Sequence, residues 1–249
     1  IGYPDGKSIT YAYDLAGNLV EATSSEGTIA MSYNSRNELT RVSYPDGIFF
    51  NYTYDNAGRL TGQEDKEGQN VTYTYDTQGH LVSVGDKSGK DYVHYSYDAA
   101  GRLVRKAVGN GVYTTYEYDQ AGRISRLANF GPSGANLSWF EYHYDTNGNP
   151  IQVETLEGTY HYIYDALGQL TEATFPDGSK EQYTYDAAGN RISATISGIS
   201  MSYATNSMNQ YILAGNESFA YDNNGNMISR TGNGTTTYEY NYDNRLTKV

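Results

Sequence analysis

The sequence predicts an all-β protein: an antiparallel meander of about twelve β-hairpin repeats that coils into a spiral or tube. Three observations lead to this expectation. One short motif recurs along the whole chain, two kinds of reverse turn alternate with it, and tyrosines alternate with polar residues before each motif aspartate. Self-similarity at a period of roughly 20 residues is typical of repeat architectures, in which each unit packs only on its neighbours.

The motif is Tyr-Thr-Tyr-Asp-x-x-Gly-x-Leu, at residues 52–60 and again at 73–81. Its aspartate slot recurs twelve times at spacings of 18 to 26 residues, with Asn34 and Ala204 filling two slots and Asp243 the last. We therefore expect residues 1–249 to form a single array. The aspartate and glycine pairs predicted to form turns are Asp14 and Gly17, Asp55 and Gly58, Asp76 and Gly79, Asp98 and Gly101, Asp119 and Gly122, Asp145 and Gly148, Asp165 and Gly168, Asp186 and Gly189, and Asp222 and Gly225.

Two kinds of short motif in each repeat are typical of reverse turns. Aspartate is favoured at the first position of a type I turn, because its carboxylate accepts backbone N–H groups, and glycine at the fourth position supplies a positive φ. A second signal, Pro-Asp-Gly, occurs at residues 45–47 and 176–178, with Glu-Gly, Ser-Gly or Asn-Gly in the corresponding places of other repeats. Each repeat should therefore be one hairpin with turns at two opposite edges.

Side chains alternate before each aspartate, which predicts a strand with one aromatic and one polar face. The tyrosines expected to line up as a ladder along the sheet are Tyr11, Tyr13, Tyr52, Tyr54, Tyr73, Tyr75, Tyr95, Tyr97, Tyr116, Tyr118, Tyr142, Tyr144, Tyr162, Tyr164, Tyr183, Tyr185, Tyr240 and Tyr242. The second strand is less regular, because apolar residues such as Val42 and Val84 appear on the other parity from Leu39 and Leu81. Either a bulge shifts the faces or both faces are partly covered. About twenty-four strands are too many for an open twisted sheet, which seldom exceeds about ten, so we expect coiling.

Composition excludes several classes of function. A net charge of −12 argues against nucleic-acid binding, and no apolar run reaches the length of a membrane span, so we expect no membrane insertion. The sequence contains no cysteine, and its 28 tyrosines replace an aliphatic core. It begins in mid-hairpin without an initiator methionine, so we expect it to be a segment of something longer.

These repeats resemble the YD repeats of the Rhs superfamily, which includes bacterial Rhs and wall-associated polymorphic toxins, the C components of insecticidal toxin complexes, and teneurins. The resemblance implies a β-sheet ribbon wound into a hollow shell. In toxin members the shell encloses a C-terminal effector, and in teneurins it is an extracellular scaffold. Toxin members also carry an aspartyl autoprotease motif with an Asp-Pro element. This sequence contains no Asp-Pro, so that activity is carried over to no residue here.

Catalytic, metal and cofactor sites are not expected. Successive turn aspartates in a meander lie two strands apart, roughly 10 Å, which is too far to share one calcium ion. His94 and His161 occupy equivalent slots three repeats apart, and His143 has the same parity, so they do not form a close set of metal ligands. No carboxylate pair stands out for glycoside hydrolysis.

The sequence therefore predicts a non-enzymatic scaffold of a secreted or surface-exposed bacterial protein, part of a shell that encloses or presents an effector domain. Its partners would be the flanking regions of the same polypeptide. Two alternatives remain open at this point. One is a surface adhesin that binds glycans through exposed tyrosines, and the other is a filament that self-associates through open sheet edges.

Overall fold

The computed structural model describes residues 8–249, and all of its regular elements are β-strands. Strands β1 to β23 belong to one antiparallel sheet, and β24 and β25 form a separate two-stranded sheet, within this described part of the chain. Each strand whose ladder is recorded pairs with the strand before or after it in sequence. The predicted all-β antiparallel meander is thus confirmed. Among residues 8–249 no helix has the length and apolar character needed to span a membrane.

The chain forms two compact units, Ile1–Glu117 with Leu127–Leu137, and Tyr118–Arg126 with Ser138–Val249. The first unit contains β1 (Thr10–Tyr13), β2 (Leu19–Ser24), β3 (Gly27–Tyr33), β4 (Leu39–Ser43), β5 (Phe49–Tyr54), β6 (Leu60–Asp65), β7 (Asn70–Tyr75), β8 (Leu81–Gly85), β9 (Asp91–Tyr97) and β10 (Leu103–Val108). Three strands contain residues of both units: β11 (Tyr113–Tyr118), β12 (Ile124–Phe130) and β13 (Asn136–Tyr144).

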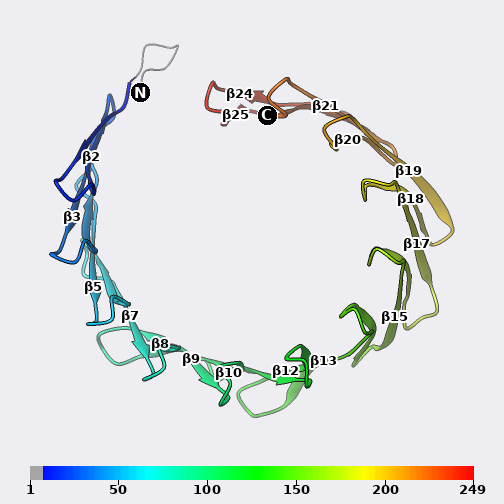
Figure 1. The fold of residues 1–249 in the computed structure, drawn as a ribbon, viewed down its shortest axis with the longest axis horizontal. Coiled ribbons are helices and arrows are strands. Elements are labelled where there is room, and N and C mark those ends of the chain that lie inside the picture. The colour runs from blue at the N-terminus through cyan, green and yellow to red at the C-terminus, as the bar shows by residue number, and fades with distance from the viewer. Residues whose placement is uncertain (1–7) are drawn as a thin grey trace. The chain divides into compact units, whose positions relative to one another are not determined.

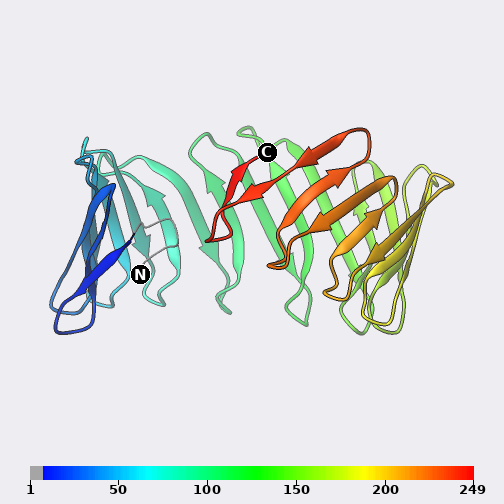
Figure 2. The ribbon, with the colours of Figure 1, turned by 90° about the horizontal axis from the view of Figure 1, so that it is seen from above.

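The second unit continues with β14 (Pro150–Thr155), β15 (Gly158–Tyr164), β16 (Leu170–Thr174), β17 (Lys180–Tyr185), β18 (Arg191–Ile196), β19 (Ile199–Thr205), β20 (Tyr211–Ala214), β21 (Glu217–Tyr221), β22 (Met227–Thr231), β23 (Thr235–Thr237), β24 (Glu239–Tyr240) and β25 (Leu246–Lys248). Within each unit the described strands lie in a single layer (Figure 1). Figure 2 shows neighbouring strands side by side, with reverse turns along both edges.

A β-bulge decides which side chains share a face. Tyr54 pairs with Leu60, but Thr53 pairs with Gly62, so Thr61 is an extra residue in β6. The same register shift follows the aspartate-type turn in the other recorded hairpins of this kind. A bulge of one residue reverses the alternation. The first and fourth residues of the second strand therefore both lie on the tyrosine face, so a shift of faces accounts for the irregular apolar pattern.

The core consists of tyrosine rings over small side chains. Tyr162 lies opposite Ala173, which is 4% exposed, and Tyr183 lies opposite Ala194, which is fully buried. In the described residues no large side chain is fully buried. A single layer has no second sheet to cover it, so the rings themselves must shield the small residues beside them. The opposite face carries mostly Thr, Ser, Glu, Arg and His, as in the cross-strand pair of Thr74 with Ser83.

Candidate functional site: turn edge, tyrosine seam and a polar hollow

The aspartate turns form one edge of each unit. In the turn of Asp55, the carboxylate Oδ1 accepts the N–H groups of Ala57 at 2.8 Å and Arg59 at 3.0 Å. The Gly58 N–H donates to the Asp55 carbonyl at 3.1 Å, and Gly58 has a φ of 79°. The same backbone hydrogen bonds close the turns of Asp14, Asp76, Asp98, Asp119, Asp145, Asp165, Asp186 and Asp222, each with its glycine at positive φ: Gly17, Gly79, Gly101, Gly122, Gly148, Gly168, Gly189 and Gly225.

Three turns use asparagine in place of both aspartate and glycine. Asn34 opens one of them, as expected, and Asn37 closes it with a φ of 61°. The prediction that Ala204 fills the next degenerate slot is wrong, because Asn206 opens that turn and Asn209 closes it. The side-chain oxygen of asparagine accepts the same N–H groups, and asparagine tolerates positive φ better than most residues.

The last turn is also shifted from its predicted place. Asn241 opens it and Asn244 closes it, so Asp243 lies within the turn, where its N–H donates to Asn241 Oδ1 at 3.0 Å. Tyr242 therefore stands in the turn and is 76% exposed, outside the ladder that we expected it to join. Tyr240 takes the slot before the turn instead, opposite Leu246 in the pairing of β24 with β25.

The residue after the fourth turn position completes a side-chain pair with the first. Where the turn opens with aspartate, the partner is a donor: Arg59 Nε lies 2.7 Å from Asp55 Oδ2, and Asn149 Nδ2 lies 3.0 Å from Asp145 Oδ2. Where the turn opens with Asn34, the partner is an acceptor, Glu38, at 2.6 Å. In these turns the two positions are matched in hydrogen-bonding sense, so that a donor meets an acceptor, whereas in the turn of Asn241 only the backbone N–H of Arg245 bonds to the opening side chain.

These hydrogen bonds hold the carboxylates ionised. The backbone N–H and then the guanidinium of Arg59 lower the pKa of Asp55, and hydrogen bonds from the side chain and backbone of Asn149 lower the pKa of Asp145. At Asp76 the largest cause of the lowered pKa is the hydrogen bond to the side chain of His80. Hydrogen bonding to the charged form is the common physical cause.

Successive turns are also joined to each other along this edge. The guanidinium of Arg36 donates to the carbonyls of Asp55, at 2.9 Å, and Asn56, at 3.1 Å, in the next repeat. Asn190 Nδ2 lies 3.2 Å from Asn209 Oδ1, and Asn226 Nδ2 lies 2.8 Å from Asn244 Oδ1. Each of these contacts spans 18 to 20 residues of sequence, which means one whole repeat. The turn edge therefore links repeat to repeat, in addition to the strand pairing.

A second set of contacts between repeats comes from the tyrosine directly before each turn. The hydroxyl of Tyr54 donates to the carbonyl of Leu39 in the preceding repeat at 2.8 Å. The equivalent hydroxyls donate in the same way at Tyr33, Tyr75, Tyr97, Tyr144, Tyr164, Tyr185 and Tyr221. We call this series of hydrogen bonds the tyrosine seam.

The tyrosines two residues earlier in these strands, such as Tyr52, Tyr162 and Tyr183, lie on the same face of the sheet. Most ladder tyrosines are half-buried, whereas Tyr11 and Tyr13 in β1 are 41% and 61% exposed. Tyr183 is the most buried of them, at 9% exposure, and its hydroxyl donates to Glu181. Burial, followed by this hydrogen bond, raises the pKa of Tyr183 to about 12. Tyr142 and Tyr144 stack with ring centroids 6.3 Å apart.

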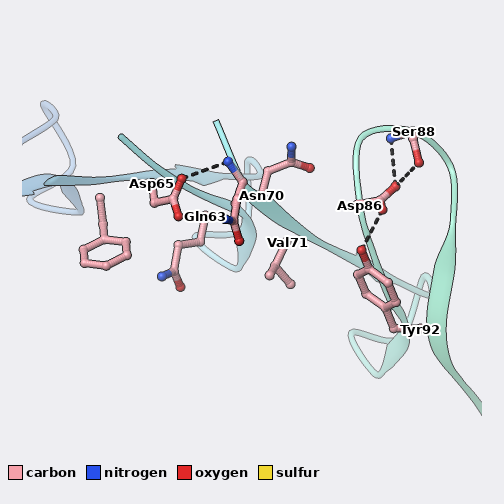
Figure 3. Close-up of a pocket in the computed structure, with 9 residues that line it drawn as sticks. Gln63, Asp65, Asn70, Val71, Asp86, Ser88 and Tyr92 are labelled. Carbon is pink, nitrogen blue, oxygen red and sulfur yellow. Dashed lines mark hydrogen bonds between the residues drawn. The ribbon is translucent and has the colours of Figure 1, made fainter. Parts of the chain in front are cut away.

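A hollow of about 490 Å³ lies on the tyrosine face of the first unit, at the edge opposite the aspartate turns. Figure 3 shows Val71 on its floor, between Asp65 and Gln63 on one side and Asp86 and Tyr92 on the other. The Tyr92 hydroxyl donates to Asp86 Oδ2 at 2.7 Å. The sequence did not indicate this site, because its lining comes from the less regular turns.

Three of the four histidines, His94, His143 and His161, lie on the polar face, whereas His80 lies at the turn of Asp76. His94 lies opposite Ser83 and Ala107, and His161 lies opposite Gln152 and Thr174. His143 Nε2 comes within 3.3 Å of Glu154 Oε1. Across residues 8–249 the structure contains no group of three or more His, Asp or Glu side chains placed to hold a metal ion.

Comparison with known proteins agrees with this architecture. The family model described as Teneurin YD-shell matches residues 1–116 and 151–249. The tRNA nuclease WapA of Bacillus subtilis and the tRNA3(Ser)-specific nuclease WapA of Bacillus spizizenii are each 39% identical over 90 residues, which is 34% of this chain and 4% of those proteins.

Solved structures show the same fold. The crystal structure of TcdB2-TccC3-TEV aligns with 98% of this chain and 17% of its own, with a TM-score of 0.74 and 19% identity. The crystal structure of TcdB2-TccC3 aligns with 96% and 17%, with a TM-score of 0.71 and 18% identity. The chain thus spans a small part of each of these proteins. Because the family model matches most of its length, the chain belongs to the teneurin YD-shell family.

Proposed function

We propose that this chain is a wall segment of a shell that encloses a polypeptide carried by the same gene product. The observation that supports this best is the continuity between repeats. Strand pairing, the turn-edge contacts and the tyrosine seam each connect one repeat to the next, as when Arg36 reaches Asp55 and Tyr54 reaches Leu39. All three sets of contacts would have to break before two neighbouring repeats could separate.

The proposed mechanism is exclusion. Adjacent strands lie about 4.8 Å apart and are hydrogen bonded along their length, which leaves no path for the extended segment that a protease must grip. A wall of this kind needs no catalytic group. The enclosed polypeptide would lie outside this chain, in a bacterial protein that is secreted or displayed at the cell surface.

Limited proteolysis of the full-length gene product tests this proposal. Thr72 is paired on both sides, with Gly62 and with Gly85, so Thr72→Pro removes a ladder hydrogen bond from a central strand. Lys66→Pro is the matched control, because Lys66 holds the second position of the Asp65–Gly68 turn, as Pro45 does in the Tyr44–Gly47 turn. We expect the enclosed polypeptide to resist cleavage in the wild type and in Lys66→Pro, and to be cleaved in Thr72→Pro.

The main control is the rate at which the enclosed polypeptide is cleaved when it is expressed without the wall. If it is cleaved no faster alone than in the intact wild-type protein, the wall gives no protection and the proposal fails. The milder variant Tyr75→Phe, which removes one seam hydrogen bond to Leu60 and leaves the backbone unchanged, should give a cleavage rate between the two extremes. This variant separates opening of a seam from general misfolding.

A further inference from the structure

The residues around the polar hollow depart from the repeat pattern at two positions. On the tyrosine face, the fourth residue of the second strand is Val42 in β4, Val84 in β8 and Ala173 in β16, but Gln63 in β6. Gln63 lies in register between Tyr52 and Val71, and it is half-buried. Its side-chain amide forms no hydrogen bond with any of residues 8–249. Polar residues take this position elsewhere too, Lys106 in β10 and Arg230 in β22, so what Gln63 adds here is an amide that lines the hollow and has no hydrogen-bond partner among the described residues.

The second departure is at the first position of the turns. Tyr44 opens one such turn and contacts Phe50 edge to face at 6.4 Å, and Phe175 opens another and contacts Tyr160 at 5.8 Å. In the two repeats that follow Tyr44, the residue opening the turn is aspartate, Asp65 and then Asp86.

At the first turn position, aspartate has a smaller side chain than tyrosine or phenylalanine and carries a negative charge. Two short acids stand where the preceding repeat places the ring of Tyr44, so the space beside Phe50 stays open and is bordered by carboxylates. Both acids accept turn N–H groups, but Tyr44 and Phe175 open equivalent turns, so the turn does not require an acid at this position.

Hydrogen bonds in the hollow hold Asp86 ionised. Asp86 accepts hydrogen bonds from the Ser88 hydroxyl, the Tyr92 hydroxyl, and the N–H groups of Ser88 and Lys90. These bonds, with that of the Ser88 side chain largest, lower its pKa to about 2. Asp65 uses Oδ1 to accept two turn N–H groups, whereas its Oδ2 forms no hydrogen bond among the described residues.

Two of three nearby cations, Lys87 and Arg59, are paired outside the hollow. Lys87 pairs with Glu64, whose cross-strand partners Asn51 and Asn70 place it on the polar face of the sheet. The Lys90 ammonium lies 5.2 Å from the centroid of the Tyr92 ring, at the rim. Arg59 is held by Asp55 at the other edge. The hollow therefore combines two aspartate side chains, an amide without a hydrogen-bond partner among the described residues, and two aromatic side chains, Phe50 and Tyr92.

We propose that this hollow binds the guanidinium of an arginine in the polypeptide that the wall encloses. A guanidinium is planar, presents several N–H donors to carboxylate and amide oxygens, and stacks on aromatic rings, whereas an ammonium ion does not stack in this way. The identity of the partner rests on the proposed function. Binding of the guanidinium can be measured without it, so the two proposals fail in different experiments.

Titration of this chain with a short peptide tests the assignment. The probe is acetyl-Gly-Ser-Arg-Ser-Gly-amide, and its counterpart carries citrulline, which has the same shape but no charge. We expect saturable binding of the arginine peptide, weakened by salt, with shifts of the Gln63 side-chain NMR signals. The citrulline peptide should bind at least about tenfold more weakly, a loss of about 1.4 kcal/mol. Equal binding of the two peptides would overturn the proposal.

Variants localise the binding. Asp65→Asn removes charge and keeps the turn, because asparagine opens the turns at Asn34, Asn206 and Asn241 in this chain. Asp65→Tyr fills the hollow with the ring that Tyr44 supplies one repeat earlier. Both should abolish saturable binding.

Asp186→Asn makes the same change of net charge at a turn of the other edge, and should leave binding as in the wild type. A loss as large in Asp186→Asn as in Asp65→Asn would show a response to net charge alone and would refute the site. If the enclosed polypeptide is protected from proteases but the arginine peptide does not bind, this inference is refuted and the proposed wall stands.

Discussion

The hydroxyl of Tyr54 lies 2.8 Å from the carbonyl oxygen of Leu39, which is fifteen residues earlier and in the preceding repeat. The ring of Tyr52, two residues before Tyr54 in the same strand, shares the face, but its hydroxyl forms no hydrogen bond with residues 8–249. Two tyrosines of one strand thus make different contacts. Tyr52 places its ring beside Gln63, whereas Tyr54 also joins its repeat to the preceding one through its hydroxyl.

The tyrosine seam predicts unequal effects of two identical chemical changes. Tyr54→Phe removes the hydrogen bond to Leu39 and should destabilise β4 and β5 by about 1 kcal/mol, the usual net value of one such bond. Tyr52→Phe should change little, because its hydroxyl has no partner to lose. Native-state hydrogen exchange of the β4 and β5 amides measures both, since an array opens locally. Similar loss of protection in the two variants would contradict the seam.

The close approach of Pro176 to Gly158 predicts a position-specific effect of alanine. A Cβ atom on Gly158 would lie 2.7 Å from Pro176 Cβ, and its φ is +129°, whereas Gly178 has a φ of +82° and open space around it. Both alanine variants should cost about 1–2 kcal/mol for the positive φ. Gly158→Ala should cost about 1–3 kcal/mol more through overlap.

Thermal unfolding of the two single variants gives the difference, and Pro176→Ala in the Gly158→Ala background isolates the overlap. The double variant should recover the overlap part and keep the cost of φ. No recovery would show that Pro176 does not press on this turn in solution.

The turn carboxylates predict loss of stability in acid. The folded-state pKa values of Asp55, Asp98 and Asp119 are lowered, first by backbone N–H groups for all three and also by their arginine partners. Groups with a lowered folded pKa contribute stability that is complete above the unfolded value, about 3.9, and is lost as pH falls through the folded value. Repeats opened by Asn34 and Asn206 carry no such charge at that position.

Residue-resolved NMR between pH 6 and pH 2 checks this expectation. Signals of the aspartate turns should shift or broaden as they titrate below about pH 4, before those of the asparagine turns change. Asp119→Asn should remove the acid transition of its own turn and spare the others. Simultaneous loss of all turns, whatever their opening residue, would argue against a local carboxylate effect.

Local chemistry made much of this fold predictable. An aspartate followed by glycine three positions later specifies a type I turn and a positive φ without reference to the rest of the chain, as at Asp55 and Gly58. Alternation in the preceding strand specifies its faces for the same reason, because neighbouring side chains on a strand always point to opposite sides. Where the pattern decayed, the local signal was too weak, and the turns at Asn206 and Asn241 were misplaced by two residues.

Other features depend on pairing, which the sequence of one strand does not encode. The extra residue Thr61 reverses the alternation in β6 only once β6 is set against β5, and this is why Gln63 faces Tyr52. The partner of the Tyr54 hydroxyl is chosen by the register of the preceding repeat, and the hollow forms because side chains from four strands and two turns meet there.

The amino-acid sequence by itself determined the repeat, its two turns and its aromatic face, because each depends on interactions within a few residues. Only the tertiary structure decided which residues meet across the seams and where a ring is replaced by a polar hollow. Those outcomes depend on contacts between residues a whole repeat apart, whose geometry is set by strand register and by the bulge.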